Sequence, residues 1–484
     1  MECADGAELI LQPLPYQRDS SDLIRCIAAL PGAACLDSGL GDQPEGRFDI
    51  LTALPSRQLR LRTTAAAAIS VEHRWRHESD WQVLPAQTCI FSAAEALLHE
   101  TKPGSSAVAD LSHLPFCGGV IACFGYESAS TASAVPAQEN GLAALLRQTP
   151  IATCGLYQWA VIVDHQRAST VLFILPECPE EIRQQVVRTL QNNGGATSPV
   201  ADNFRLVSAF QAQLGPAQYE AAFDQLKSYI IAGDCYQANL AIPFVARYRG
   251  DPLQVYLRLR QASRSPFSAF IAMDDTQVLS LSPERFVSVH DRQVVTQPIK
   301  GTRRRSSDPV VDRQLSDELQ ASDKDRAENL MIVDLLRNDL GSVCETGTVR
   351  TRDLFKLHSF SQVHHLISTI TGTLPASVSP FTLLRRCFPG GSITGAPKIR
   401  AMEIIAELEP LPRAVYCGSV AYCDYRGHMD SSISIRTLLC QQDHIFCWGG
   451  GGIVADSEMA HEYQEAFDKV SALLDLVSAQ SDLQ

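Results

Sequence analysis

Short apolar strand segments follow one another closely in the second half of the chain, and this pattern constrains the fold more than any other feature. The segments are VLSLS, FVSVH, RQVVTQPI, SVAYC, SISIRTLL and HIFCWGG, and the first 200 residues add GRFDILTAL and QWAVIVDH. Segments with apolar residues at helical spacing interrupt them at residues 216–234, 323–341 and 458–477. We therefore expect an α+β protein with large antiparallel sheets.

A segment of linker composition, QNNGGATSPVADN at residues 191–203, divides the chain. The length of 484 residues is enough for two or three ordinary domains. We expect an N-terminal region over residues 1–200 and a second region over residues 205–478, where the motifs gather. We expect the two regions to be interleaved in one globule.

Charge and hydropathy exclude several classes of function. The formal net charge of -13 disfavours a nucleic acid partner, and the basic run Arg303–Arg305 is too short to reverse it. No apolar run approaches the length of a membrane span, and the acidic N-terminus does not have the basic start of a signal peptide. The 15 scattered cysteines predict reduced thiols that fill the core. We expect a cytoplasmic protein with no membrane contact.

Two of the predicted helices carry acidic residues three positions apart. The pairs are Asp325 with Glu328 and Glu462 with Glu465, and this spacing puts each pair on one helix face. Facing carboxylates from two helices could hold Mg²⁺, which prefers oxygen ligands. On spacing alone, two solvated acidic faces are the alternative.

Two glycine-rich segments allow the backbone to approach a ligand closely. CWGGGGIVADS, residues 447–457, holds four consecutive glycines ahead of an Asp-Ser that we expect to open a helix, and amides there would favour an anion. The spacing is not that of a dinucleotide-binding fingerprint. FPGGSITGAPK, residues 388–398, lacks the Lys-Ser/Thr of a phosphate-binding loop, so an ATPase interpretation fails.

Three charged side chains stand at strand segments. Glu284 follows Pro283 at the end of a strand; if buried, it would have a raised pKa and could act as a general acid, and a surface pair with Arg285 is the alternative. Arg436, predicted inside the strand SISIRTL, offers either a carboxylate clamp or a buried ion pair. Lys300 lies between a strand and a Gly-Thr turn, where most lysines are solvated.

A series of motifs between residues 205 and 475 resembles, in sequence and order, the chorismate-utilising enzymes. The motifs are DCYQANLA, SLSPERF, QPIKGT, DRAENLMIVDLLRNDLG, HSFSQVHHLIS, FPGGSITGAPKIRAMEII, YCGS, SISIRTL, and GGGGIVADS followed by EYQEAFDK. Weaker matches, PLPY, ACLDSG and GGVIACFGYE, extend to the N-terminus. The resemblance implies the fold of anthranilate synthase component I, in which large antiparallel sheets form a sandwich flanked by helices.

The resemblance also implies roles for individual residues. Glu284, Lys300 and His365 match catalytic positions, and Glu328 and Glu465 match Mg²⁺ ligands, supported by Glu462 and Asp325. Chorismate would be held by Tyr416, Arg436, Gly450, Gly451 and Gly452, with Thr302 and Lys469 at the margin. Feedback tryptophan in relatives occupies a pocket matched here by Ser38, Glu45, Gly46, Arg47, Phe48, Pro266, Phe267 and Ser268, which makes a bound tryptophan an open alternative.

Lys300 decides between branches of the family. Anthranilate synthases typically have PIAGT where this chain has PIKGT, so the resemblance points to aminodeoxychorismate synthase component I. It implies that Lys300 attacks C2 of chorismate and displaces the C4 hydroxyl, after which ammonia adds at C4 and expels the lysine. Gln237 stands where isochorismate and salicylate synthases have a lysine that activates water, which disfavours those activities. Arg304 replaces a usual proline without removing the nucleophile.

Amination requires ammonia, and the chain has no Gly-x-Cys-x-Gly motif of a glutaminase. The resemblance therefore implies a separate glutaminase subunit as partner. Two alternatives stay open: anthranilate synthase component I, and a non-catalytic protein that binds chorismate or tryptophan.

Overall fold

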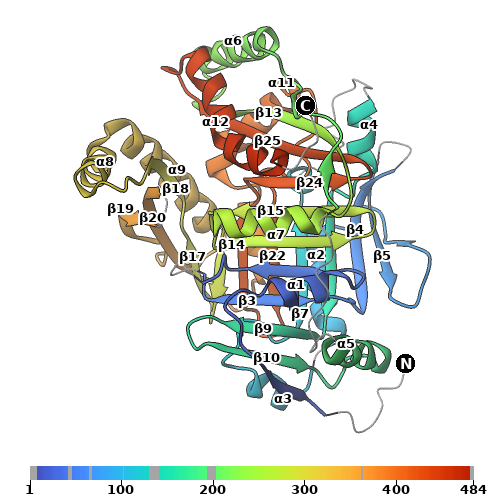
Figure 1. Ribbon diagram of the computed structural model, residues 1–484. Coiled ribbons are helices and arrows are strands. Elements are labelled where there is room, and N and C mark those ends of the chain that lie inside the picture. Colours follow the sequence, from blue (N-terminus) through green and yellow to red (C-terminus); the bar gives the residue numbers. More distant parts are fainter. Residues whose placement is uncertain are drawn as a thin grey trace.

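Two large sheets, packed face to face, organise the chain (Figure 1). The computed structural model describes residues 8–41, 46–64, 68–101, 103–129, 141–192, 203–360 and 363–479. All strand pairs in both sheets are antiparallel, from β1 with β10 to β7 with β8. The predicted α+β class with large antiparallel sheets is confirmed.

The first sheet has the strand order β1-β10-β9-β3-β2-β14-β15-β24-β25-β13-β11, and β12 and β21 also pair with β13. Its strands are β1 Ile10–Leu14, β2 Ala34–Asp37, β3 Phe48–Thr52, β9 Trp159–Asp164, β10 Ser169–Ile174, β11 Arg205–Leu206, β12 Gln211–Ala212, β13 Gln237–Arg249, β14 Phe267–Met273, β15 Thr276–Ser282, β21 Gly395–Ala396, β24 Thr437–Gln441 and β25 His444–Ile453.

The second sheet has the order β18-β20-β17-β16-β23-β22-β7-β8-β4-β5-β6, and β19 pairs with β20. Its strands are β4 Arg57–Thr63, β5 Ile69–Trp75, β6 Gln82–Val83, β7 Gly119–Phe124, β8 Ala152–Tyr157, β16 Ser288–His290, β17 Gln293–Thr296, β18 Ile299–Arg304, β19 Arg350–Ser359, β20 Val363–Thr373, β22 Ser419–Asp424 and β23 Met429–Ile433. In each sheet, strands from residues 1–200 pair with strands from residues 205–478.

Helices cover the outside of the sandwich. They are α1 Ser21–Ala28, α2 Ile90–Glu100, α3 Ser105–Asp110, α4 Gly141–Gln148, α5 Glu180–Asn192, α6 Pro216–Ala232, α7 Pro252–Ser263, α8 Pro309–Ala321, α9 Asp323–Gly341, α10 Pro380–Cys387, α11 Lys398–Leu408 and α12 Met459–Ser478, with 3₁₀ turns η1 Tyr126–Ala129 and η2 Gly391–Ile393. Helices α8 and α9 pack beside β18 at one side of the molecule (Figure 1).

Local signals explain where the helices begin and end. Helix α6 has Pro216 in its first turn, and Gly233 ends it in the left-handed conformation, with φ of 84°. The side chain of Ser322 accepts a hydrogen bond from the Asp325 N–H and caps α9. The three predicted helices are confirmed, within one or two residues, as α6, α9 and α12.

Alternating side chains divide the buried residues into two cores. In β14, Ala269 and Ile271 face the core between the sheets, whereas Phe270 faces a second core under the helices. Residues of β7 and β22 complete the core between the sheets, and α6, α7 and α12 cover the outer face of the first sheet. The first sheet is thus buried on both faces, which explains its near-continuous apolar strands.

One predicted strand is wrong in a way that matters for the site. SISIRTL does not form a single strand: β23 ends at Ile433, β24 begins at Thr437, and Arg436 between them has φ of 50°. The reason is that β23 belongs to the second sheet and β24 to the first, so the chain crosses between the sheets here. Polar and apolar residues alternate from Ser432 to Arg436, so the sequence does not show where one strand ends and the next begins.

The glycine run also differs from the prediction. Its residues lie in β25, and the following helix begins at Met459, so the expected amides at a helix start do not occur. The glycines let α12 approach the strand closely: a Cβ on Gly449 would lie 2.1 Å from the carbonyl oxygen of Ala466. The predicted linker at residues 191–203 lies almost entirely outside the described residues.

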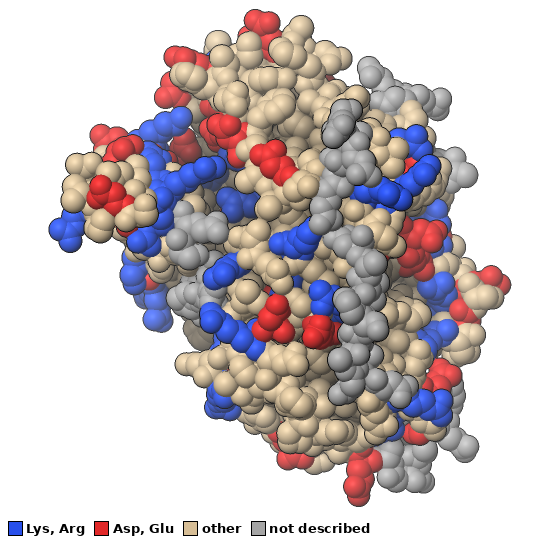
Figure 2. All heavy atoms as spheres, in the orientation of Figure 1, with Lys and Arg blue, Asp and Glu red and all other residues tan. Residues whose placement is uncertain are grey.

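Acidic and basic side chains are interspersed over the face drawn in Figure 2. No disulfide joins cysteines of the described residues, and nearly all of these cysteines are buried, which confirms their prediction as core residues. Among the described helices, none combines the length and the apolarity needed to cross a membrane.

Candidate active site

A cavity of about 500 Å³ brings together most of the predicted site residues. Both sheets contribute to it, together with α9, η2 and α12. The predicted residues that line it are Glu284, Lys300, Thr302, Asp325, Glu328, His365, Tyr416, Arg436, Gly450, Gly452, Glu462, Glu465 and Lys469. Gln237 lines it as well.

Lys300 reaches the cavity from an irregular strand. The pairing of β18 with β20 shifts register between Ile299 and Thr302, and Gly301 has φ of 86°. The ammonium of Lys300 donates a hydrogen bond of 3.1 Å to the carbonyl oxygen of Ser392. Burial lowers the pKa of Lys300, and nearby Lys469 lowers it further, against the opposing charges of Glu284, Glu328 and Glu465. A lowered pKa increases the fraction of neutral amine, the nucleophilic form.

Glu284 lies at a crossing between the sheets, after β15 and before β16. Its side chain is 5% exposed, and its carboxyl accepts a hydrogen bond of 3.2 Å from the Ser392 hydroxyl. Burial raises the pKa of Glu284 to about 7, although Lys300 and the Ser392 hydrogen bond act against the rise. A substantial fraction of this carboxyl is therefore protonated near neutral pH.

A later crossing, from β23 to β24, carries Arg436 and lies beside the crossing at Glu284. The Ile433 N–H donates to the Glu284 carbonyl, and the Leu281 N–H donates to the Arg436 carbonyl. The side chain of Arg436 lines the cavity and forms no hydrogen bond or ion pair within the described part of the chain. Burial lowers its pKa, and Glu284 opposes that shift. An unpartnered guanidinium in a cavity is suited to a carboxylate.

Thr302 and His365 are directly opposite each other in the pairing of β18 with β20. The Thr302 hydroxyl and His365 Nδ1 are 2.8 Å apart. Burial lowers the pKa of His365 to about 4, and the charge of Arg436 adds to this effect. The imidazole is therefore neutral near pH 7 and can accept or donate a hydrogen bond, but it is not an acid there.

Acidic side chains from α9 and α12 face the same cavity. Burial raises the pKa of both Glu328 and Glu462, and the repulsion of Glu465 contributes to each rise. Burial acts in the same direction on Glu465, but its ion pair with Lys469, at 2.7 Å, lowers its pKa overall. These carboxylates provide the oxygen donors that Mg²⁺ prefers.

The acidic residues do not form a compact cage. Among the described residues, only His290, Asp291 and His428, outside this cavity, have three ligand atoms within 4.8 Å of one another. A cation between α9 and α12 would therefore need oxygen ligands from a substrate or water.

Gly450 and Gly452 line the cavity, whereas a Cβ on Gly451 would lie 2.9 Å from Oε2 of Glu462. Lys469 donates a hydrogen bond of 2.8 Å to the Gly450 carbonyl. Tyr416 is 5% exposed and stacks on Trp448, with ring centroids 6.3 Å apart. Strand β25 and helix α12 are thereby fixed around one side of the cavity.

Several lining residues were not predicted from sequence. They include Asn239, Lys324, Ser392 and Trp448. Ser392 matters most because it contacts both Lys300 and Glu284, and its motif FPGGSITGAPK was the available signal. Its role was missed because residues 92 and 108 positions earlier in the chain approach it only in the folded protein.

The predicted tryptophan pocket is only partly assembled. Phe48, Pro266, Phe267 and Ser268 line a separate cavity of about 110 Å³. Ser38 and Arg47 do not line it, because they bind Asp49 and Asp164. Gly46 does not line it either, and Glu45 lies outside the described residues.

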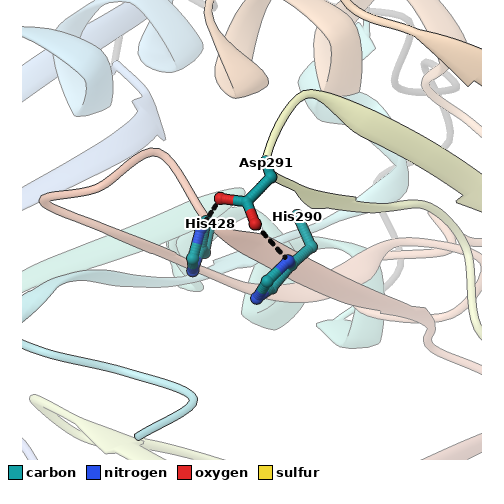
Figure 3. Close-up of side chains that lie close together, drawn as sticks. All are labelled: His290, Asp291 and His428. Atoms are coloured by element: carbon teal, nitrogen blue, oxygen red, sulfur yellow. Dashed lines mark hydrogen bonds and ion pairs between the residues drawn. The ribbon is translucent and has the colours of Figure 1, made fainter. Parts of the chain in front are cut away.

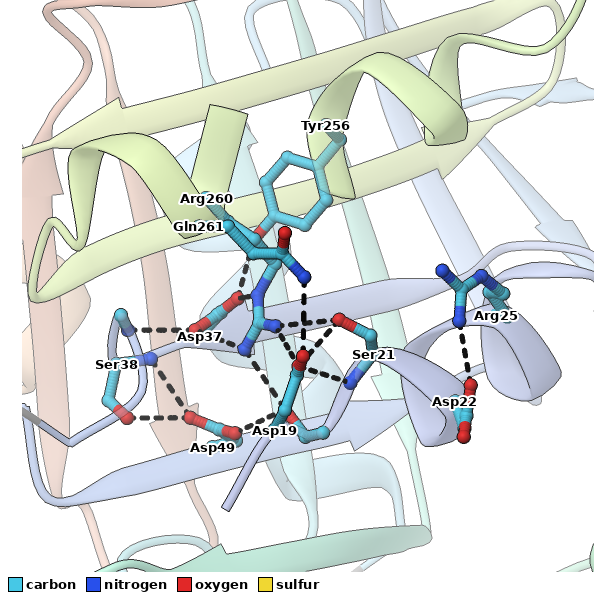
Figure 4. Close-up of polar contacts among 12 residues, drawn as sticks. Asp19, Ser21, Asp22, Arg25, Asp37, Ser38, Asp49, Tyr256, Arg260 and Gln261 are labelled. Atoms are coloured by element: carbon cyan, nitrogen blue, oxygen red, sulfur yellow. Dashed lines mark hydrogen bonds and ion pairs between the residues drawn. The ribbon is translucent and has the colours of Figure 1, made fainter. Parts of the chain in front are cut away.

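A buried polar network borders this smaller cavity (Figure 4). Arg260 of α7 is fully buried and pairs with Asp37 of β2, which lines the cavity. Arg260 also binds Asp19 at 2.7 Å, and Asp49 accepts hydrogen bonds from Ser20 and Ser38. This network links α1, β2, β3 and α7 and has no direct contact with Lys300 or Glu284.

Known proteins resemble this chain over most of its length. Residues 50–475 match the family described as chorismate binding enzyme. The chain is 43% identical to an aminodeoxychorismate synthase component 1 of Klebsiella aerogenes, over 95% of this chain and 97% of that protein. It is also 43% identical to the Escherichia coli protein of the same name, over 93% and 94%. A crystal structure of anthranilate synthase component I from Streptococcus pneumoniae matches with a TM-score of 0.74 and 27% identity, over 88% of this chain and 92% of that one.

Proposed function

Because the chain belongs to the family of chorismate binding enzymes, as its motifs predicted, we propose that it is the large subunit of a 4-amino-4-deoxychorismate synthase. The enzyme aminates chorismate at C4, and its product leads to 4-aminobenzoate and folate. The amination activity is supported by relatives named aminodeoxychorismate synthase component 1, which cover nearly the whole chain.

One observation carries the choice of reaction: Lys300 and Glu284 are bound to the same residue. The carbonyl of Ser392 accepts from the Lys300 ammonium at 3.1 Å, and the hydroxyl of Ser392 donates to Glu284 at 3.2 Å. The pKa values of this amine and this carboxyl are both displaced toward neutrality, and one serine contacts both groups. The pair therefore suits a nucleophile, Lys300, and an acid, Glu284, that act together.

The proposed reaction has two steps. In the first, the neutral amine of Lys300 forms a bond to C2 of chorismate, the ring double bonds shift, and the C4 hydroxyl leaves as water with a proton from Glu284. In the second, ammonia forms a bond to C4, the double bonds shift back, and the C2–N bond to Lys300 breaks. Glu284 is then ready to be protonated again, and no oxidant or reductant is required.

Neutral His365 has a positioning role in this proposal. Its Nδ1 is fixed by Thr302 at 2.8 Å, which orients the ring in the cavity. With a pKa of about 4 it stays uncharged during turnover. We assign it a hydrogen bond to the departing hydroxyl, and we assign proton donation to Glu284.

The substrate is a dianion, and the cavity offers separate groups for its two carboxylates. Arg436, Tyr416 and the backbone of Gly450 to Gly452 hold the enolpyruvyl carboxylate in this proposal. Glu328 and Glu465, with Glu462 and Asp325 nearby, would hold Mg²⁺. When bound, Mg²⁺ would supply positive charge for the ring carboxylate of chorismate, and these residues would thereby orient the ring for attack.

Ammonia comes from a separate glutaminase subunit in this proposal. The relatives are named component 1, which implies a second component, and the sequence contains no Gly-x-Cys-x-Gly motif for a glutaminase of its own. Free ammonium at sufficient concentration should replace the partner in vitro. We propose a cytoplasmic location for the pair.

Anthranilate synthase component I is the second candidate, favoured by the structural match to such an enzyme. Lys300 argues against it. In an anthranilate synthase ammonia must reach C2, and the Lys300 side chain projects into the cavity where it would compete for that carbon.

A coupled assay tests the proposal. The purified protein is incubated with chorismate, Mg²⁺ and an ammonium salt, and an aminodeoxychorismate lyase is then added. We expect 4-aminobenzoate only when the lyase is present. Fluorescent anthranilate without lyase would favour the second candidate, and no turnover in either assay would favour a non-catalytic binding protein.

A further inference from the structure

Two histidines and an aspartate meet at the tips of neighbouring hairpins, outside the active-site cavity (Figure 3). His290 ends β16, and Asp291 begins the two-residue turn to β17. His428 lies in the turn between β22 and β23. Because Val289 pairs with Met429 across the antiparallel strands, the next positions, His290 and His428, are brought side by side.

The turn conformation aims the carboxylate at both rings. Asp291 and the following Arg292 have φ of 47° and 66°, as a two-residue turn with both residues in the left-handed region requires. Asp291 Oδ1 lies 3.1 Å from Nε2 of His428, and Oδ2 lies 3.3 Å from Nδ1 of His290. One carboxylate therefore spans the two imidazoles.

These separations suit a tetrahedral metal ion. Ligands at about 2.0–2.1 Å from Zn²⁺ are separated from one another by about 3.3 Å in tetrahedral geometry. The separations of 3.1 and 3.3 Å, which run from the two imidazoles to the two different oxygens of Asp291, are close to that value, and one ligand atom from each residue lies within 4.8 Å of the others. Small side-chain rotations would thus be enough to bind an ion.

The charges of the cluster also favour a cation. The rings of His290 and His428 stack with centroids 4.0 Å apart, which brings two imidazole groups, a common kind of metal ligand, to one place. The adjacent arginines form their ion pairs elsewhere, Arg292 with Glu345 and Arg426 with Asp424, so among the described residues the Asp291 carboxylate forms ion pairs only with the two imidazoles, although the charge of Arg426 still acts on it.

We propose that His290, Asp291 and His428 form a binding site for a transition-metal dication such as Zn²⁺, with water as the fourth ligand. Imidazole nitrogen suits Zn²⁺, whereas Mg²⁺ prefers oxygen ligands, so this site differs in selectivity from the acidic cavity. The side chains of His290 and Asp291 are 74% and 78% exposed, which leaves an entry path and a position for water.

The bound ion would join two hairpins whose strands lead to the active site. Strand β17 continues to β18 and Lys300, and β23 continues to the crossing with Arg436. The effect we assign to the ion is structural stabilisation of the turns of these two neighbouring hairpins in the second sheet. This inference is independent of the proposed amination, since it depends on neither chorismate nor the cavity residues.

The test is calorimetric titration of the metal-free full-length protein with Zn²⁺, in excess Mg²⁺ to occupy oxygen sites. We expect one tight site in the wild type, at least tenfold weaker binding in His290→Asn and in His428→Asn, and a Zn²⁺-dependent rise of the melting temperature that both variants lose. Co²⁺ titration should give the visible bands of a tetrahedral complex, again only with both histidines.

His461→Asn is the matched control, because His461 is an exposed histidine 3.4 Å from Glu458. It should bind Zn²⁺ as the wild type does. Circular dichroism identifies any variant that fails to fold, and Asp291→Asn then serves as the third ligand deletion. Equal Zn²⁺ affinity in the wild type and the histidine variants, or no binding in any of them, would overturn the proposal and leave only a hydrogen-bonded His–Asp–His cluster.

Discussion

Replacing Glu284 with glutamine should stabilise the protein at alkaline pH while it removes activity. The carboxyl of Glu284 has an ordinary pKa near 4.5, which burial raises to about 7 in the folded protein. Between these two values the folded state holds a proton that the unfolded state has released. The free energy of unfolding therefore falls as the pH rises from 4.5 to 7, and the full cost of the buried charge is present above pH 7.

The size of this effect follows from the displacement of the pKa. Each pKa step of one is worth 1.36 kcal/mol, so the displacement costs about 3 kcal/mol above pH 7. Unfolding entropy of about 2.1 cal/mol/K per residue gives about 1 kcal/mol/K for a chain of this length. Glutamine keeps an oxygen that accepts from Ser392 but carries no charge. The melting temperature of Glu284→Gln should therefore exceed that of the wild type by about 3 °C at pH 8.5, and by much less at pH 5.

The activity of Glu284→Gln should fall, whereas its stability at alkaline pH should rise. Loss of a general acid typically lowers kcat by about 10²–10⁴-fold. In the wild type, kcat/KM should fall as the pH rises through about 7, because Glu284 loses the proton that it must donate. The residual activity of the variant should lack this alkaline decline.

The measurements are differential scanning fluorimetry across pH and the lyase-coupled assay. Glu220→Gln is the control, since Glu220 is exposed on α6 and its replacement should leave both profiles unchanged. A stability difference that is the same at pH 5 and at pH 8.5, or wild-type kcat in Glu284→Gln, would refute the assignment of a buried acid.

Three further changes test other parts of the structure. Lys300→Ala should abolish or greatly slow 4-aminobenzoate formation and release some anthranilate, because C2 becomes open to ammonia; unchanged 4-aminobenzoate would contradict the covalent role. Glu465→Gln should raise the Mg²⁺ concentration for half-maximal activity by about tenfold or more, since loss of even an outer-shell partner typically lowers metal affinity by that factor. An unaltered Mg²⁺ titration would exclude Glu465 as a ligand. Arg260→Leu leaves Asp37 buried without its partner and should cost about 3–5 kcal/mol of stability, whereas Arg247→Leu, at an exposed pair with Asp443, should cost about 0–1 kcal/mol by the same thermal measurement.

Much of the fold was predictable because local signals and tertiary structure agree. The helix ended by Gly233 and the helix capped before Asp325 lie where their sequences indicate, and the second of them, α9, lines the cavity. Strands such as β15 and β22 were likewise visible as apolar runs. What the sequence did not reveal is which strand belongs to which sheet, because strand partners are set by packing over long distances in the chain.

The active site lies at the points where the chain crosses between the sheets, which the sequence did not reveal. Glu284 and Arg436 each stand at a point where the chain crosses from one sheet to the other, and backbone hydrogen bonds hold the two crossings together. Family motifs identified both residues without explaining why they meet. A continuous strand through SISIRTL would have directed Arg436 along one sheet, whereas the break with φ of 50° lets it enter the cavity.

Backbone geometry also distinguishes a nucleophilic lysine from a solvated one at this position. In a regular strand the side chain of Lys300 would alternate with its neighbours and follow the register of β20. The irregular pairing between Ile299 and Thr302 breaks that register, and it depends on Gly301, since a Cβ there would lie 3.0 Å from Leu319 and 3.1 Å from Asp325 at a φ of 86°. Lys300 is thereby directed to the carbonyl of Ser392, beside Glu284. The glycine that follows the lysine in PIKGT therefore helps to place the amine in the cavity, where its pKa is lowered. On a regular, solvated strand, a lysine at this position would keep its ordinary pKa and remain protonated at neutral pH.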